Sequence, residues 1–194
     1  MEIKGKENIP SQCPAILVVN YTSLLDPFVV TCCTNRIIHW LVAIWVFRIK
    51  PFSFFAKRIP FFKVEPGKGS NKEALKEARR LLKQERIIGV FSEGRLSRNG
   101  KLNTFLSGAA YLGLKSKPPI IPLYINDVYN VSGYENNFLK LPKICVIIRE
   151  KFFLNGVYNP VYKDDIALGS EYIRDRIAIL KNSSLRNKYI PKRR

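Results

Sequence analysis

The chain has 194 residues, 46% of them hydrophobic, which is enough for one substantial core and unlike the composition of a disordered protein. Its 33 lysines and arginines against 15 aspartates and glutamates predict a surface that attracts phosphate, whether on nucleic acid, anionic lipid or an acidic metabolite. The four cysteines form neither a CxxC pair nor a zinc-ligand spacing, so no metal site is expected and a reducing cytosolic compartment fits best.

Residues 16–19 form the first of four short runs rich in valine and isoleucine, which predict buried strands. The others are residues 87–91, 120–125 and 145–148.

The loop that follows the first predicted strand, residues 20–26, reads NYTSLLD. An apolar run that stops at polar residues and an acid is how a buried strand delivers functional groups to a sheet edge. The same residues are also typical of a helix start, with Thr22 or Ser23 as the N-cap and Asp26 in the first turn. The sequence logic leaves both interpretations open.

The longest apolar stretch, residues 37–47, is well short of the roughly 20 residues that cross a bilayer, so no transmembrane segment is predicted. No secretory signal peptide is recognised either. Aromatic residues are interspersed with basic ones from Trp40 to Arg58, which suits a surface resting in lipid headgroups or a plain core. The single histidine, His39, is interpreted as a core or interfacial side chain.

A Gly-rich connection, residues 65–72, carries Lys68 but lacks the full phosphate-loop pattern, and an ordinary flexible loop is the better interpretation. The segment that follows, SNKEALKEARRLLKQER, keeps its apolar residues on one face and predicts an amphipathic helix with a capping box of Ser70 and Glu73.

The segment VFSEGRLSRNGK, residues 90–101, ends a predicted strand with a turn at Gly94 that is followed by Arg95 and Arg98. Backbone amides at a glycine turn together with guanidinium groups would make a phosphate cradle. A basic surface loop explains the same residues, and the sequence does not separate the two.

Further helices are predicted over residues 105–115 and 170–181. The alternation of helices and strands predicts an α/β sandwich with a largely parallel sheet. Residues 1–180 are interpreted as a single domain and residues 181–194 as a basic tail. That tail holds six basic residues and no acid, which indicates either a phosphate-binding segment or a solvated terminus with no role.

Taken in order, these segments resemble the phospholipid/glycerol acyltransferase family, whose best-known members are the 1-acylglycerol-3-phosphate acyltransferases. The resemblance covers roughly residues 3–130. The family's first motif, Asn-His followed by Ser and Asp, falls on Asn20, Ser23 and Asp26, with Tyr21 in the place of the histidine.

Two later motifs of the family are also recognisable. Residues 91–97 are similar to the family's Phe-Pro-Glu-Gly-Thr-Arg-Ser, and residues 120–123 are similar to its apolar strand with a central proline. Three basic positions of the family pattern are replaced, by Ala43, Pro66 and Leu96. The cations that handle the acceptor's phosphate in the family are therefore missing at these positions.

The resemblance implies a glycerol-3-phosphate acyltransferase-like sandwich, with a mostly parallel sheet flanked by helices. It implies a role in phospholipid synthesis, by acyl transfer from acyl-CoA or acyl carrier protein to a hydroxyl of a lysophospholipid or glycerol-phosphate acceptor, with no cofactor. In the family the histidine is the general base and the aspartate orients it, roles that would fall on Tyr21 and Asp26.

The acceptor pocket implied by the resemblance includes Ser23, Glu93 and Gly94. Arg95, Arg98 and Lys68 would replace the lost phosphate contacts.

Tyr21 puts the activity in question. A tyrosine with an ordinary pKa near 10 is ionised at pH 7 to about one part in a thousand, a handicap of roughly 4 kcal/mol as a base. The protein is then either an acyltransferase in which Tyr21 or a water takes the proton, or an inactive member that serves as a lipid- or acyl-chain-binding subunit. Nucleic-acid binding rests on charge alone and is the weakest hypothesis.

The expected partners are an anionic membrane surface, an acyl donor and a lysolipid-type acceptor. The chain begins close to the first predicted strand, without the hydrophobic N-terminal segment of many family members. We therefore expect a cytoplasmic protein, peripheral on the inner face of the cell membrane, that uses its basic and aromatic surface for contact.

Overall fold

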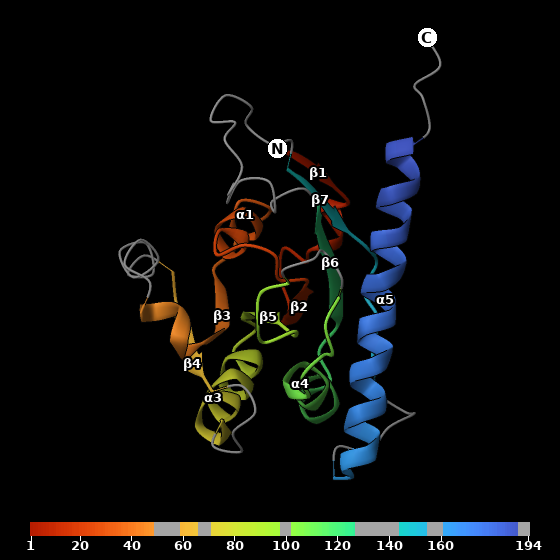
Figure 1. The fold of residues 1–194 in the computed structure, drawn as a ribbon. Helices are drawn as coiled ribbons and strands as arrows, with labels where there is room; N and C mark the ends of the chain where they lie inside the picture. Colours follow the sequence, from red (N-terminus) through yellow and green to blue (C-terminus); the bar gives the residue numbers. More distant parts are fainter. Residues whose placement is uncertain (49–58, 66–70, 98–101, 127–143, 155–160, 190–194) are drawn as a thin grey trace.

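A seven-stranded sheet forms the centre of the molecule in this computed structural model, which describes residues 1–48, 59–65, 71–97, 102–126, 144–154 and 161–189 (Figure 1). The strand order is β1-β7-β6-β2-β5-β3-β4, and every neighbouring pair is parallel except β6 with β7. The strands are β1 (Glu2–Lys4), β2 (Ala15–Val19), β3 (Ile38–Ala43), β4 (Phe61–Val64), β5 (Ile87–Phe91), β6 (Ile120–Asn126) and β7 (Cys145–Ile148). The predicted mostly parallel sheet is confirmed.

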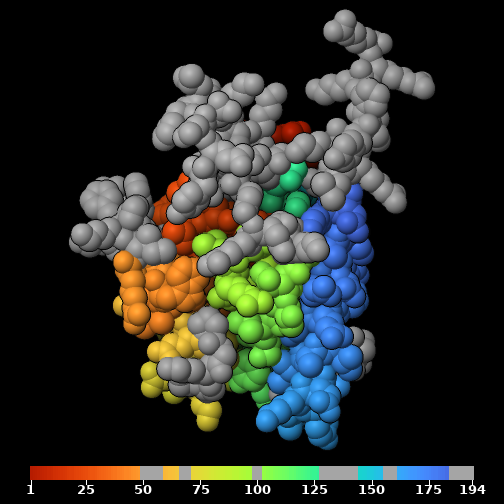
Figure 2. Space-filling model, viewed as in Figure 1, coloured from red at the N-terminus to blue at the C-terminus, as the bar shows by residue number. Residues whose placement is uncertain are grey.

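Helices cover both faces of this sheet. They are α1 (Asp26–Thr31), α3 (Lys72–Lys83), α4 (Gly108–Ser116) and α5 (Lys163–Tyr189), with the 3-10 helices η1 (Lys6–Asn8) and η2 (Ile44–Arg48). Figure 1 shows α5 alongside β6, and Figure 2 shows it as a blue column against the green segment that carries α4. In the described part of the chain, no helix has the length and apolarity that a membrane span requires.

The two faces of the sheet hold two separate hydrophobic cores. In β2, Leu17 and Val19 pack on the face covered by α1, whereas Ile16 and Val18 pack on the face covered by α3, α4 and α5. Side chains of a strand alternate between faces, and a parallel sheet with helices on both faces buries them all. This burial explains why the central strands read as unbroken apolar runs.

All four predicted strands are present, and three further strands were missed. β1 has only three residues, and β3 and β4 lie in the aromatic stretch for which core and membrane surface were left open. Trp40 of β3 is fully buried, so this part of the stretch belongs to the core. Its later residues, 49–58, lie outside the described residues.

The predicted helices are present with shifted ends. α5 extends from residue 163 to residue 189 instead of from 170 to 181, so the first part of the basic tail is helical. The N-cap of α3 is Asn71, whose side chain caps no N–H group of the helix. It pairs instead with the backbone of Glu65: Oδ1 accepts from the Glu65 N–H at 2.7 Å, and Nδ2 donates to the Glu65 carbonyl oxygen at 2.8 Å. The predicted cap Ser70 lies outside the described residues.

Three aromatic rings are stacked beneath α1. The ring of Trp40 lies 4.7 Å from that of Phe91, which lies 4.4 Å from that of Tyr21, centroid to centroid. Gly89 makes room for this stack, because a Cβ there would lie 2.4 Å from Cε3 of Trp40. The stack therefore depends on a residue without a side chain in the middle of β5.

Gly89→Ala is expected to lower the free energy of unfolding by about 1–3 kcal/mol, because the added methyl group forces the indole ring out of its packed position. Urea denaturation monitored by tryptophan fluorescence measures the change. Gly169→Ala in α5 is the matched control: its Cβ would meet its nearest neighbour at 3.4 Å, so the gain in helix propensity should leave stability equal or higher. Equal stability of the two variants would contradict this packing.

Candidate functional site

A pocket of about 340 Å³ opens at the carboxyl ends of four adjacent parallel strands. Tyr21 follows β2, Ser92 follows β5, and Ala43 and Val64 are the last residues of β3 and β4. This edge is where open α/β sheets bind their ligands, since loops from neighbouring strands converge there. The pocket is therefore the candidate functional site.

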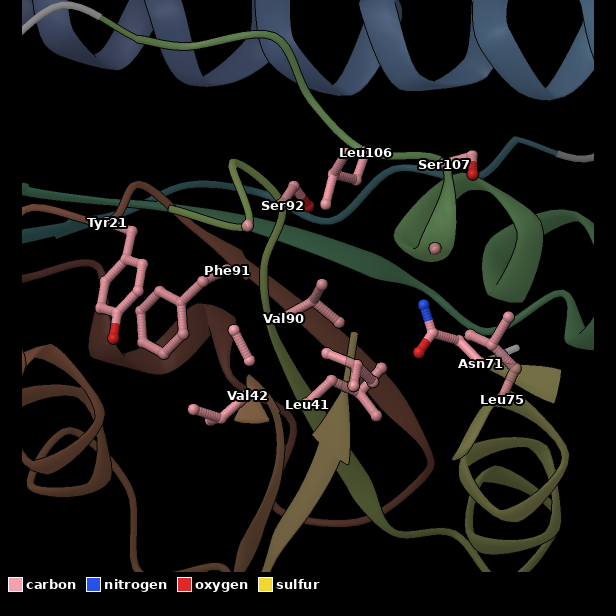
Figure 3. A pocket seen from close by; sticks show the side chains of 14 residues that line it. Tyr21, Leu41, Val42, Asn71, Leu75, Val90, Phe91, Ser92, Leu106 and Ser107 are labelled. Atoms are coloured by element: carbon pink, nitrogen blue, oxygen red, sulfur yellow. The ribbon is translucent and has the colours of Figure 1, made fainter. Parts of the chain in front are cut away.

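The walls of the pocket are mainly apolar. Leu41, Val90 and Leu75 line part of it, and Figure 3 shows Leu41 near Val90 at the centre of the view and Leu75 beside Asn71. The polar side chains of the lining are those of Tyr21, Asn71, Ser92 and Ser107. Within the described residues the lining contains no charged side chain, so this cavity suits an apolar chain with a few polar contacts.

Asn20 fixes the end of β2 to β6. Its Nδ2 donates to the carbonyl oxygen of Ile125 at 3.0 Å, and its Oδ1 accepts from the Ile125 N–H at 2.7 Å. The amide side chain thus continues the parallel ladder by one buried pair beyond the last paired residues, Val19 and Leu123. It sets the direction in which the chain leaves the strand toward Tyr21.

Glu93 joins three loops around the pocket. It is 3% exposed, and its Oε1 accepts from the N–H of Tyr21 at 2.9 Å. Its Oε2 accepts from both N–H and Nδ2 of Asn103, at 2.9 and 2.8 Å. Gly94, which follows, has a φ of 63°, a conformation that favours glycine and lets its N–H bond back to Phe91. Glu93 therefore acts as a structural acceptor in the loops that shape the pocket.

Asp26 organises the loop after β2. One of its oxygens, Oδ2, accepts from the backbone N–H of Thr22 at 2.7 Å and of Ser23 at 2.9 Å. The N-cap of α1 is Leu25, and no side chain caps that helix. The helix-cap interpretation was therefore wrong about Thr22 and Ser23, because the carboxylate of Asp26 itself binds their backbone.

Burial gives Asp26 an unusual titration. Desolvation raises its pKa to about 7, with a smaller contribution from the negative charge of Glu93, against the lowering effect of its backbone hydrogen bonds. Its second oxygen, Oδ1, is buried and has no hydrogen-bond partner among the described residues. Asp26 is therefore a carboxyl group that changes its charge near neutral pH.

Tyr21 does not pair with Asp26. Its ring is 2% exposed and stacked on Phe91, and the two rings lie side by side in Figure 3. Its hydroxyl is buried and has no hydrogen-bond partner within the described part of the chain. Burial, and then the charge of Asp26, raise the pKa of Tyr21 far above its ordinary value. The hydroxyl at this position therefore stays protonated at physiological pH.

The structure brings together some of the predicted site residues. Tyr21 and Gly94 line the pocket. Ser23, Asp26 and Glu93 are buried in the loops around it without lining it. Arg95 is exposed and does not line it, and Arg98 and Lys68 lie outside the described residues.

Sequence reasoning missed most of the residues that line the cavity. Ser92 lies in the recognised motif and directly follows a predicted strand, so the sequence could have identified it as a site residue. Asn71, Ser107 and the apolar residues of β3 could not be found in this way, because their place at the pocket depends on which strands become neighbours.

His39 lies at the other end of β3 from the pocket. Its ring is stacked on Phe62 at 6.0 Å, and burial, aided by the charge of Arg86, lowers its pKa. Across the residues that the structure describes, no group of histidine, cysteine, aspartate and glutamate side chains could hold a metal ion.

Glu93→Gln is expected to lower the free energy of unfolding by about 1–3 kcal/mol, because a glutamine would turn an NH₂ group toward N–H donors that need an acceptor. Chemical denaturation of the full chain measures the loss. Glu73→Gln, an exposed change in the first turn of α3, is the control and should stay within about 0.5 kcal/mol of wild type. If both variants match wild type, Glu93 does not hold these loops.

Asp26 should make stability depend on pH in a defined direction. Because its pKa rises from 3.8 to about 7 on folding, its contribution to stability is full below pH 4 and is lost as the pH rises through 7. Relative to Asp26→Asn, in which residue 26 does not titrate, the free energy of unfolding of the wild type should fall by up to about 4 kcal/mol between pH 4 and pH 8. Denaturation series of both proteins test this, and parallel curves would contradict it.

Comparison with known proteins gives one result for the sequence family and one for the fold. The family model described as Acyltransferase matches residues 1–126. A 1-acyl-sn-glycerol-3-phosphate acyltransferase of Borreliella burgdorferi is 27% identical in an alignment of 147 residues that covers 68% of this chain and 52% of the relative. The chloroplastic 1-acyl-sn-glycerol-3-phosphate acyltransferase BAT2 of Brassica napus is 26% identical in an alignment of 183 residues that covers 91% of this chain and 49% of the relative. The chain thus spans about half the length of these two curated relatives.

The crystal structure of the 1-acyl-sn-glycerophosphate (LPA) acyltransferase PlsC of Thermotoga maritima has the same fold. It matches with a TM-score of 0.64 and 21% sequence identity, over 93% of this chain and 72% of PlsC. The family match covers the first six strands, the aromatic stack and every residue that lines the pocket. On this basis the chain belongs to the acyltransferase family and is related to the lysophosphatidic acid acyltransferases.

Proposed function

We propose that this protein is a lipid-binding member of the acyltransferase family, which keeps an acyl-chain pocket and lacks the histidine-based proton transfer of the family. The state of Tyr21 carries the proposal. A general base must reach the proton that it removes and must have a pKa near the working pH. The Tyr21 hydroxyl is buried, has no hydrogen-bond partner among the described residues, and has a pKa raised by burial.

Asp26 does not compensate for this loss. In a catalytic dyad the carboxylate binds the base and holds it in the correct orientation. Here one oxygen of Asp26 is occupied by two backbone N–H groups, and Asp26 does not line the pocket. The hydrogen bonds of Asp26 thus stabilise the loop after β2 and do not orient a base in the pocket.

The apolar lining supports lipid as the ligand. Leu41, Val90, Leu75 and Leu106 offer the kind of surface that an acyl chain buries, and burial of each methylene is worth about 0.8 kcal/mol. The net charge of +18 would favour a peripheral position on an anionic inner leaflet, where lysophospholipids are found. These points support an acyl lipid, carried by acyl-CoA, acyl carrier protein or a lysophospholipid.

Acyl transfer to a hydroxyl of a lysophospholipid or glycerol phosphate is the second candidate function. Asp26 favours it, because a carboxyl group with a pKa of about 7 and one unpartnered oxygen can accept a proton at neutral pH. In that case Asp26 or a water would take the proton and Tyr21 would donate a hydrogen bond. Arg95, Arg98 and Lys68 would then take the acceptor's phosphate.

A turnover assay separates the two candidates. The full chain is incubated with palmitoyl-CoA and either lysophosphatidate or glycerol 3-phosphate, and release of free CoA is followed beside Tyr21→His and Asp26→Asn. We expect the wild type to bind palmitoyl-CoA and to release no CoA above the buffer rate. Turnover by the wild type that Asp26→Asn abolishes would overturn the proposal in favour of acyl transfer.

A stability measurement tests the role of Tyr21 independently. Tyr21→Phe keeps the stacked ring and removes a buried hydroxyl without a partner, so the free energy of unfolding should be unchanged or higher. A loss of more than about 1 kcal/mol would show that the hydroxyl makes a hydrogen bond that matters, and would contradict the packing role.

A further inference from the structure

The part of the pocket lining near the start of α4 carries polar groups, in contrast to the apolar walls. Ser92, Ser107 and Gly108 line the pocket there, together with the apolar Leu106. The side chain of Ser92 is 2% exposed, and its hydroxyl has no hydrogen-bond partner among the described residues. Buried hydroxyl groups are nearly always paired, so this group needs an explanation.

The backbone holds Ser92 beside the start of α4. Its carbonyl oxygen accepts from the N–H of Leu106 at 2.6 Å, two residues before the helix begins. Figure 3 shows Ser92 next to Leu106, with Ser107 following toward the helix. Ser92, which lines the pocket, therefore lies on the side of the pocket where α4 begins.

The N-terminus of α4 is itself uncapped. Its N-cap, Ser107, makes no side-chain hydrogen bond to the helix, and no acidic residue lies in its first turn. The first N–H groups of a helix have no partner within the helix and carry a partial positive charge. Hydrogen-bond donors from Ser92 and from the start of α4 thus lie at the same end of one cavity, as a site for an oxygen acceptor requires.

We propose that this end of the pocket binds the head of an acyl chain, with its carbonyl or carboxylate oxygen at the α4 N-terminus and the Ser92 hydroxyl. The apolar walls take the chain itself. The inference rests on the proposed acyl-chain pocket and adds the position and chemistry of the head group. Ser92 stands where the family motif has a proline, which has no hydroxyl, so this contact would be a property of this chain.

Binding of twelve-carbon probes to the full chain tests this arrangement, by displacement of a fluorescent fatty acid. Dodecanoate carries a carboxylate, dodecanoyl-CoA a thioester carbonyl, and 1-bromododecane no comparable acceptor. Ser92→Ala should weaken the binding of dodecanoate about tenfold, which is the usual contribution of one hydrogen bond. The affinity for 1-bromododecane should be unchanged. If the affinity for dodecanoyl-CoA falls as well, the carbonyl oxygen is the group that is bound. If only the affinity for dodecanoate falls, the carboxylate is the group that is bound.

The controls separate a lost contact from a disturbed fold. Ser92→Ala removes an unpartnered buried hydroxyl, so its thermal unfolding midpoint should not fall. Ser170→Ala, at a buried serine of α5 that bonds to Ile166 and does not line the pocket, should leave all three affinities unchanged.

A second variant places a competing acceptor at the site. Ser107→Asp should raise the unfolding midpoint, because it puts a negative charge beside the N-terminus of α4, and it should weaken dodecanoate binding, because that charge competes with the carboxylate for the same end of the helix. Greater stability with poorer binding is a result that a purely structural role would not produce.

The outcomes also separate this inference from the proposed function. If the wild type binds all three probes and neither variant weakens the two oxygen-bearing ones, the head-group site is wrong and the acyl pocket stands. If the wild type binds none of them, the acyl pocket is wrong as well.

Discussion

The buried carboxylate of Glu93 is the interaction on which the pocket depends. It accepts hydrogen bonds from Tyr21 after β2 and from Asn103 before α4, while its own residue belongs to the turn after β5. These segments are 72 and 10 residues away from Glu93 along the chain. The pairing of β2 with β5 and the backbone hydrogen bonds from Ser97 to Tyr21 and from Leu106 to Ser92 also bring these loops together, and Glu93 adds one buried side chain that contacts all of them. A carboxylate is suited to this task because it accepts on both oxygens and never presents a donor to an N–H group.

The stack of Trp40, Phe91 and Tyr21 gives the loop after β2 a second constraint. The ring of Tyr21 fills its place in this loop and packs face to face on Phe91. Burial that favours packing disfavours proton transfer by the phenol, because the low dielectric keeps Tyr21 protonated; the same burial raises the pKa of Asp26 to about 7. The same environment therefore packs the ring of Tyr21 and keeps its hydroxyl protonated.

The lining of the pocket indicates what kind of ligand it can bind. Its apolar walls come from the strand tips and from α3, and its polar end comes from Ser92 and the start of α4. Such a division matches a ligand with one long apolar part and one oxygen-bearing end. Affinity would come mainly from the burial of the chain, and the orientation of the ligand from a few donors.

The sequence by itself determined the α/β class, the four strands with continuous apolar runs and the amphipathic α3, and it singled out Tyr21, Asp26 and Glu93 as candidate site residues. It did so because these signals are local: periodicity, a strand that ends in polar residues, and the spacing of a motif. Only the tertiary structure decided that Trp40 is core, that Asp26 binds backbone instead of Tyr21, and that Ser92 and Ser107 share one cavity. Those facts depend on which strands become neighbours and which groups lose water, and no short stretch of sequence carries that information.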